Sequence, residues 1–132
     1  MNIDKIRTYI TYFETTISID FCKWIPAEKS DDGCIIMGYP IYDDAFEQFV
    51  MDVSASEFFD YQYPETIERY GFDFLTSDQI KRIEEADLTL TKAVLTRYIR
   101  IERFCEGTWE HAVKDGIFLA LLRRLNILLT LD

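Results

Sequence analysis

The sequence predicts a mainly α-helical protein, a small bundle of four to five helices in a single domain over residues 1–132. Apolar residues recur at helical spacing in several segments, and only 5 Gly and 3 Pro interrupt the chain, so we expect few long loops. Hydrophobic residues make up 48% of the sequence, which is enough to fill a core at this length. One short β-hairpin near residues 20–38 is the exception that local composition favours.

The first predicted helix ends at about Thr16 and has Asn2 as its N-cap. Beyond Thr16, alternation of apolar side chains as far as Phe21 also suits a strand, so the sequence leaves residues 17–21 open. The apolar face of the helix recurs every three or four positions, at Ile3, Ile6, Ile10, Phe13 and Ile17.

The predicted hairpin would turn within residues 26–33, whose Pro, Ser, Asp and Gly content is typical of a loop. The flanking segments 21–25 (FCKWI) and 34–38 (CIIMG) either pair as two strands or lie as extended arms over the helical core. An isolated two-stranded ribbon is only marginally stable, so it has to pack on something, and Trp24 is the expected anchor.

A second helix is expected to open at Pro40 and to end near Glu57. Its apolar side chains share one face, and Asp43 and Asp44 suit its first turn because the helix dipole favours acidic groups there.

Segment 58–74 is aromatic and acidic. Within it, Pro64 and Gly71 bracket one or two helical turns. The aromatic side chains either line a pocket or close one side of the core, since large exposed apolar patches are uncommon in monomers.

Two further helix starts are predicted by their caps. Thr76 is followed three residues later by Gln79, the spacing of a capping box. Asp87 either caps the next helix or marks a kink in a longer one.

The central pair of antiparallel helices is predicted over residues 88–105 and 108–129. Gly107 is expected in the left-handed conformation that ends a helix, with Thr108 capping the next one. The final helix is apolar nearly all round, so it is either the central helix or packs one face on a second copy of the chain. Gly116 inside that helix costs about 1 kcal/mol relative to Ala, which a close helix crossing would explain.

The helix predicted over residues 88–105 is apolar over more than half of its circumference and has one narrow polar strip, in which every charge is positive. The strip contains Lys92, Thr96, Arg100 and Arg103, at spacings that place them on one face. Three cations and a hydroxyl in this arrangement suit a bound phosphate or carboxylate. The alternative is that they pair with the acidic middle of the chain.

Two charges of the same helix fall inside its apolar arc, at Arg97 and Glu102. Charges at such positions have to be paired or to reach the boundary of the core. A buried Arg97 would be expected to bind a carboxylate in bidentate fashion.

The same stretch resembles an uncharacterised family of small bacterial proteins, a domain of unknown function. The residues that carry the resemblance are Leu95-Thr96, Arg100, Glu102-Arg103-Phe104, Gly107 and Arg124-Leu125. The resemblance implies no reaction, ligand or partner. It directs attention to Arg100, Glu102, Arg103 and Gly107.

The net charge of −10 argues against direct nucleic-acid binding and against binding to anionic membranes. Residues 43–87 carry 13 acidic and 3 basic side chains, whereas residues 88–132 carry 5 and 7. The most apolar run, residues 117–131, is too short for a membrane span and contains two arginines. Three scattered cysteines and one histidine fit a cytoplasmic protein and predict no metal site and no cofactor.

The sequence therefore supports three hypotheses, of which the first is a non-enzymatic cytoplasmic module that binds an unknown protein partner. This module would form a homo-oligomer through its C-terminal helix. The second hypothesis is a binder of, or an enzyme acting on, a small anionic ligand at the basic strip. The third is an acidic mimic or inhibitor of a nucleic-acid-binding protein, acting through the acidic middle segment.

Overall fold

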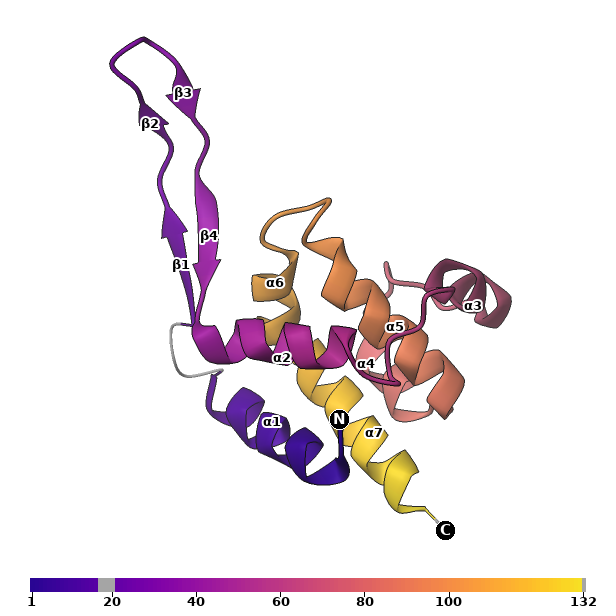
Figure 1. The fold of residues 1–132 in the computed structure, drawn as a ribbon. Coiled ribbons are helices and arrows are strands. Elements are labelled where there is room, and N and C mark those ends of the chain that lie inside the picture. The colour runs from indigo at the N-terminus through magenta and orange to yellow at the C-terminus, as the bar shows by residue number, and fades with distance from the viewer. Residues whose placement is uncertain (17–20, 132) are drawn as a thin grey trace.

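A computed structural model describes residues 1–16 and 21–131 of the chain. In those residues it shows seven helices and one long antiparallel ribbon (Figure 1). The predicted class is confirmed, but the number of helices exceeds the four to five expected. The turns bracketed by Pro64 and Gly71 form a helix of their own, and the last predicted helix is divided in two. The strand alternative around Ile17 and Ile19 lies outside the described residues. In chain order the elements are α1 (Ile3–Thr16), β1 (Cys22–Ile25), β2 (Glu28–Lys29), β3 (Ile35–Ile36), β4 (Tyr39–Tyr42), α2 (Asp44–Ser54), α3 (Tyr63–Tyr70), α4 (Gln79–Glu84), α5 (Leu88–Ile101), α6 (Thr108–Lys114) and α7 (Ile117–Thr130).

The C-terminal helix α7 is the central helix of the body and packs against α1, α4, α5 and α6. Phe118 lies at the centre of an aromatic cluster, stacked on Phe13 at 5.7 Å between ring centroids and edge-on to Phe46 and Phe49. This agrees with the first of the two expectations for a helix that is apolar nearly all round. The fully buried side chains of this core include Phe13, Phe46, Phe49, Phe118, Leu121, Leu122 and Leu125.

The predicted single helix over residues 108–129 is wrong, because the chain breaks between α6 and α7 at Gly116. Gly116 has a φ of 78°, a left-handed conformation that glycine adopts without the steric cost of a Cβ. A Cβ at this position would have nothing within 4 Å, so a close helix crossing is not the reason for the glycine. The preceding helix also ends early, at Ile101 rather than residue 105.

Several predicted helix ends are confirmed. The side chain of Asn2 accepts a hydrogen bond from the Lys5 amide, and Asp87 caps α5 by accepting from the Leu90 amide at 2.8 Å. Gly71 ends α3 and Gly107 precedes α6, both with positive φ.

Other predicted starts are wrong. Pro40 lies in β4, so the second helix begins at Asp44 with Asp43 as its cap. The capping box predicted from Thr76 and Gln79 is also absent, because α4 begins only at Gln79. The Gln79 side chain instead donates a hydrogen bond to the Phe74 carbonyl. Thr108 is the first residue of α6 rather than its cap, and its hydroxyl donates a hydrogen bond to the Cys105 carbonyl.

Residues 21–42 form a ribbon, here called the arm, that projects away from the helical body (Figure 1). The predicted hairpin is therefore present but longer, and its pairing differs. Segment 21–25 pairs with Tyr39–Tyr42 rather than with 34–38, and Ile35–Ile36 pair with Glu28–Lys29 inside the segment expected to be a loop. The arm does not lie over the helical core, and only its base is packed, as the buried side chains of Cys22 and Tyr42 show.

Candidate functional site

The base of the arm meets the corner between α5 and α6 at the carboxylate of Glu102. This carboxylate accepts hydrogen bonds from the Tyr42 hydroxyl at 2.8 Å and from the backbone amides of Gly107 and Trp109, each at 2.9 Å. Trp24 adds a second contact, because its ring lies against Gly107 and its indole N–H donates to Glu110. Trp24 is thus the anchor that the sequence predicted. The Glu102 carboxylate, which the sequence placed in the apolar arc of its helix, is stabilised by three hydrogen-bond donors and no cation.

The pKa of Tyr42 is raised above its ordinary value. Partial burial is the main cause, and the hydrogen bond to Glu102 and its negative charge act in the same direction. The hydroxyl therefore stays protonated and remains a donor over the physiological range.

Two hollows lie on either side of Arg103 and Trp109. One, of about 290 Å³, is bounded by the arm base through Tyr39, Pro40 and Tyr42 and by Glu102 and Glu106 of the corner. The other is about 300 Å³ and lies between α2, the segment after it, α5 and α6. Its lining includes Val50, Phe59, Ile99 and Arg100 together with the shared Arg103 and Trp109.

The structure brings together only part of the predicted basic strip. Arg100 and Arg103 line the 300 Å³ hollow, with the Arg100 guanidinium 6.0 Å from the centre of the Phe59 ring. Thr96 is buried, and its hydroxyl accepts from the Asp60 amide and donates to the Lys92 carbonyl. Lys92 is partly buried on another part of the helix face and is absent from the lining of that hollow.

Of the two outcomes expected for Arg97, pairing with a carboxylate or reaching the boundary of the core, the structure shows the second. The Arg97 guanidinium lies 3.7 Å from the centre of the Phe74 ring and 5.5 Å from that of Tyr98. Arg97 is only partly buried, so the charge reaches the boundary of the core and the aromatic faces attract it there. Phe74 is one of the aromatic residues whose role the sequence left open.

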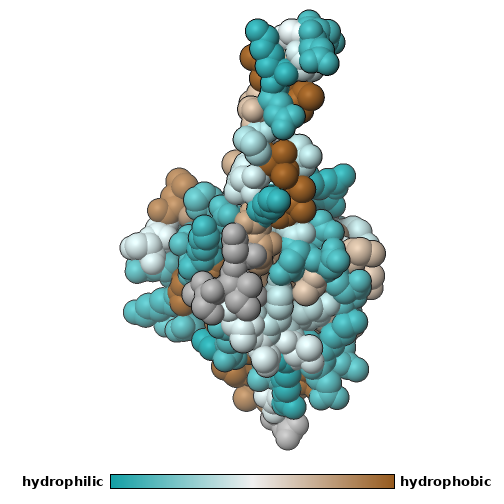
Figure 2. Space-filling view, turned by 90° about the vertical axis from the view of Figure 1, so that its left-hand side faces the viewer, coloured by the Kyte–Doolittle hydropathy of each residue, from teal (hydrophilic) through white to brown (hydrophobic). Residues whose placement is uncertain are grey.

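The outer part of the arm exposes large apolar side chains, which form brown patches along the projection in Figure 2. Ile35 is 71% exposed and Met37 is 75% exposed, and they flank the exposed Ile36. Trp24, Tyr39 and Ile41 continue this exposure towards the base. Of these residues, only Trp24 was singled out in the sequence, because an exposed strand and a buried one have the same local apolar pattern.

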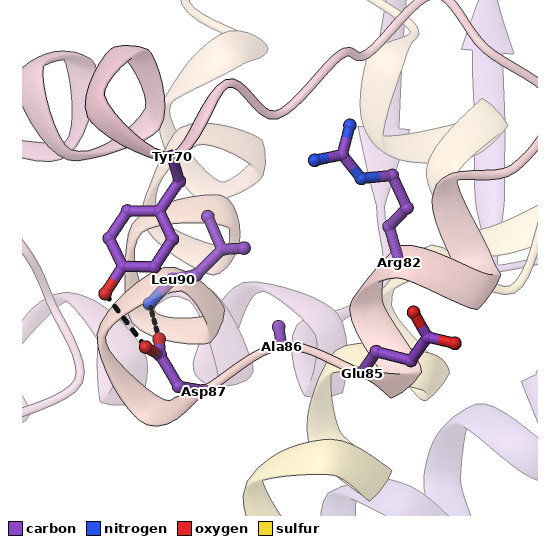
Figure 3. Close-up of a pocket in the computed structure, with 6 residues that line it drawn as sticks. All are labelled: Tyr70, Arg82, Glu85, Ala86, Asp87 and Leu90. Carbon is purple, nitrogen blue, oxygen red and sulfur yellow. Dashed lines mark hydrogen bonds between the residues drawn. The ribbon is translucent and has the colours of Figure 1, made fainter.

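A third pocket, of about 320 Å³, lies between α3, α4 and the start of α5 (Figure 3). Three of its polar side chains, Tyr70, Arg82 and Asp87, already have structural partners. Asp87 caps α5 and accepts from the Tyr70 hydroxyl at 2.9 Å, and Arg82 donates to the Gly71 carbonyl. The polar groups with these contacts hold the short helices in place.

In the acidic middle segment, residues 43–87, the carboxylates of Asp43, Asp52, Glu57 and Asp60 also have structural partners. Asp43 caps α2 and accepts from Tyr12, Asp52 binds Lys5 and Tyr9, and Glu57 binds the amino terminus. The carboxylate of Asp60 accepts from the Gln62 amide and the Thr66 hydroxyl. Asp44 and Glu47 lie exposed on the first turn of α2.

Three further features concern metals, membranes and the single histidine. Over residues 1–16 and 21–131, no group of three or more His, Cys, Asp or Glu side chains is placed to hold a metal ion. None of the helices in that part of the chain is long and apolar enough to cross a membrane. His111 is exposed on α6.

The sequence did not single out Trp109 or Tyr42 for this site. Trp109 follows the Gly107 turn directly, and a large aromatic residue just after a tight corner was the available signal. Tyr42 had no such signal, because its contact with Glu102 spans 60 positions.

Comparison with curated proteins and comparison with solved structures each gave no match. A family model does match, over residues 1–130, and its description is a family of unknown function, DUF6508. The match extends far beyond the C-terminal stretch whose pattern first suggested an uncharacterised family. The chain therefore belongs to the DUF6508 family.

Proposed function

We propose that this protein is a non-enzymatic interaction module that binds a partner protein through the outer part of its arm, residues 28–37, here called the arm tip. The observation that carries the proposal is the exposure of three consecutive large apolar side chains, Ile35, Ile36 and Met37, on a ribbon that projects from the body (Figure 2). Contiguous exposed apolar surface is uncommon in monomers and marks contact sites.

The partner is expected to receive side chains of the tip rather than to add a strand to the arm. The strands of the tip, Glu28–Lys29 and Ile35–Ile36, are only two residues long, so their free hydrogen-bonding edges are short, and Pro26 and Pro40 just below them have no backbone N–H to donate. The tip also carries the acidic Glu28, Asp31 and Asp32 and one basic residue, Lys29, which gives it a net charge of −2. A matching surface is an apolar groove on another protein with basic side chains along its rim.

The experiment places a benzophenone photo-crosslinking amino acid at position 36 and, as a matched control, at the 95% exposed Leu75 on the body. Irradiation in the native host should give a discrete adduct from position 36 and none from position 75. The captured protein is then purified, and its affinity for the isolated module is measured by calorimetry.

Substitutions in the arm tip test whether its apolar side chains bind the partner. The variant with Ile35→Ser, Ile36→Ser and Met37→Ser should keep its melting temperature, because these side chains contribute little to the core, and should lose binding of the purified partner. Met51→Ser, exposed on α2, should bind like the wild type. Equal binding by the triple variant, or equal adducts from positions 36 and 75, contradicts the proposal.

A further inference from the structure

We infer that the hollow between α2, α5 and α6 is a binding site for a small carboxylic acid with an apolar body. The site is separate from the arm tip and does not depend on the function proposed for it. Its volume of about 300 Å³ is at the lower end of the range for small-molecule sites.

The lining of the hollow combines apolar and cationic side chains. Val50, Phe59, Ile99 and Trp109 supply the apolar lining, while Arg100 and Arg103 supply two guanidinium groups. Ser54 also lines it, but its hydroxyl donates to the Val50 carbonyl of the same helix and is already engaged. An apolar body with one anionic end therefore matches the site.

The two arginines have no carboxylate partner in the described part of the chain. The ion pairs found there use the amino terminus, Lys5, Lys114 and Arg123. The nearby Glu102 accepts from Tyr42, Gly107 and Trp109, and Glu106 lines the neighbouring hollow rather than this one. A protein with a net charge of −10 thus leaves two cations at one apolar hollow, where an external anion complements them.

A carboxylate fits these donors because a guanidinium presents parallel N–H groups that match its two oxygens. Arg100 is held near the Phe59 ring, 6.0 Å from its centre, and Arg103, just after the end of α5, lines the same hollow. The aromatic walls would then contact the body of the acid. This arrangement selects for charge and an apolar group together.

Trp109 provides a direct readout, because Trp24 and Trp109 are the 2 Trp residues of the chain. In a Trp24→Phe background, fluorescence reports on Trp109 alone. The probe is 3-phenylpropionate, and the matched neutral probe is 3-phenylpropanamide, which has the same body without the charge. We expect a saturable change with the acid and binding of the amide weaker by about tenfold or more.

Variants then locate the site. Arg100→Gln and Arg103→Gln should each weaken binding of 3-phenylpropionate by about tenfold, whereas Arg69→Gln on α3 should leave it unchanged. The comparison of acid with amide on the background protein needs no arginine substitution, so it remains decisive if a variant does not fold. Absence of a saturable change at millimolar acid, equal binding of the amide, or unchanged binding by Arg103→Gln overturns the inference. None of these results bears on crosslinking at the arm tip.

Discussion

The hydroxyl of Tyr42, the last residue of the arm, donates a hydrogen bond to the carboxylate of Glu102 at 2.8 Å, across 60 positions of the chain. The same carboxylate accepts from the amides of Gly107 and Trp109 at the start of α6. The Glu102 side chain therefore holds the arm base and the corner between α5 and α6 together. Its bond to the Trp109 amide also positions Trp109, which lines both neighbouring hollows.

Removal of this junction should destabilise the protein. Glu102→Ala leaves the Gly107 and Trp109 amides without their acceptor, and we expect the free energy of unfolding to fall by about 2–3 kcal/mol. Glu102→Gln keeps one acceptor oxygen and should lose about half as much. Urea denaturation measures both changes, and a loss below about 0.5 kcal/mol for Glu102→Ala would show that the junction is not a stabilising contact.

Alkaline pH should weaken the same junction. The folded-state pKa of Tyr42 lies above its ordinary value of 10.0, through burial first and Glu102 second, so the folded protein retains a proton that the unfolded chain releases. This contribution to stability is complete below pH 10 and is lost as pH rises above it. Tyr42→Phe should reduce the alkaline slope of the unfolding free energy by up to about 1.4 kcal/mol per pH unit. Identical slopes in the variant and the wild type contradict this expectation.

Arg97 should stabilise the protein through an aromatic ring rather than through an acid. Its guanidinium is 3.7 Å from the centre of the Phe74 ring. A double-mutant cycle with Arg97→Met and Phe74→Leu should give a coupling energy of about 0.5–1 kcal/mol. High salt should leave that coupling nearly unchanged, because no exposed ion pair is involved. A coupling near zero would place Arg97 in solvent.

Gly116 distinguishes a broken helix from a continuous one. With a φ of 78° at this position, Gly116→Ala should lower the unfolding free energy by about 1–2 kcal/mol. Gly116→Asn should cost less, since Asn tolerates the left-handed conformation better. In an unbroken helix the same change to Ala would instead stabilise by about 1 kcal/mol, so the sign of the change in thermal or urea stability decides.

The predicted homo-oligomer through the C-terminal helix stays a prediction, with a smaller surface than the sequence suggested. The inner side chains of α7 are taken by the core, and exposed apolar groups remain at Ile127, Leu129 and Leu131. Light scattering should show an oligomer that Ile127→Asp with Leu129→Asp converts to a monomer. A wild-type monomer across micromolar concentrations would refute self-association by this route.

The sequence by itself determined the helical class, the helices α1 and α3, the start of α5, and the caps Asn2 and Gly71, and it offered a cap as one of two roles for Asp87. Each of these depends on residues within about one turn, where apolar period and capping chemistry act directly. It also pointed to Arg97, Glu102 and Trp24 as residues that needed a contact within the fold.

Only the tertiary structure decided which groups these residues contact. Arm pairing, the Tyr42–Glu102 bond and the stacking of Arg97 on Phe74 join residues far apart in the chain or on separate elements, so no local period encodes them. Burial was decided in the same way: Thr96 and Arg100 share one helix, yet packing of residues 58–60 covers the first and leaves the second at an open hollow. Contacts between residues far apart in the chain are set by how the whole core packs. For this reason neither the hollow between α2, α5 and α6 nor the exposed arm tip could be located from the sequence.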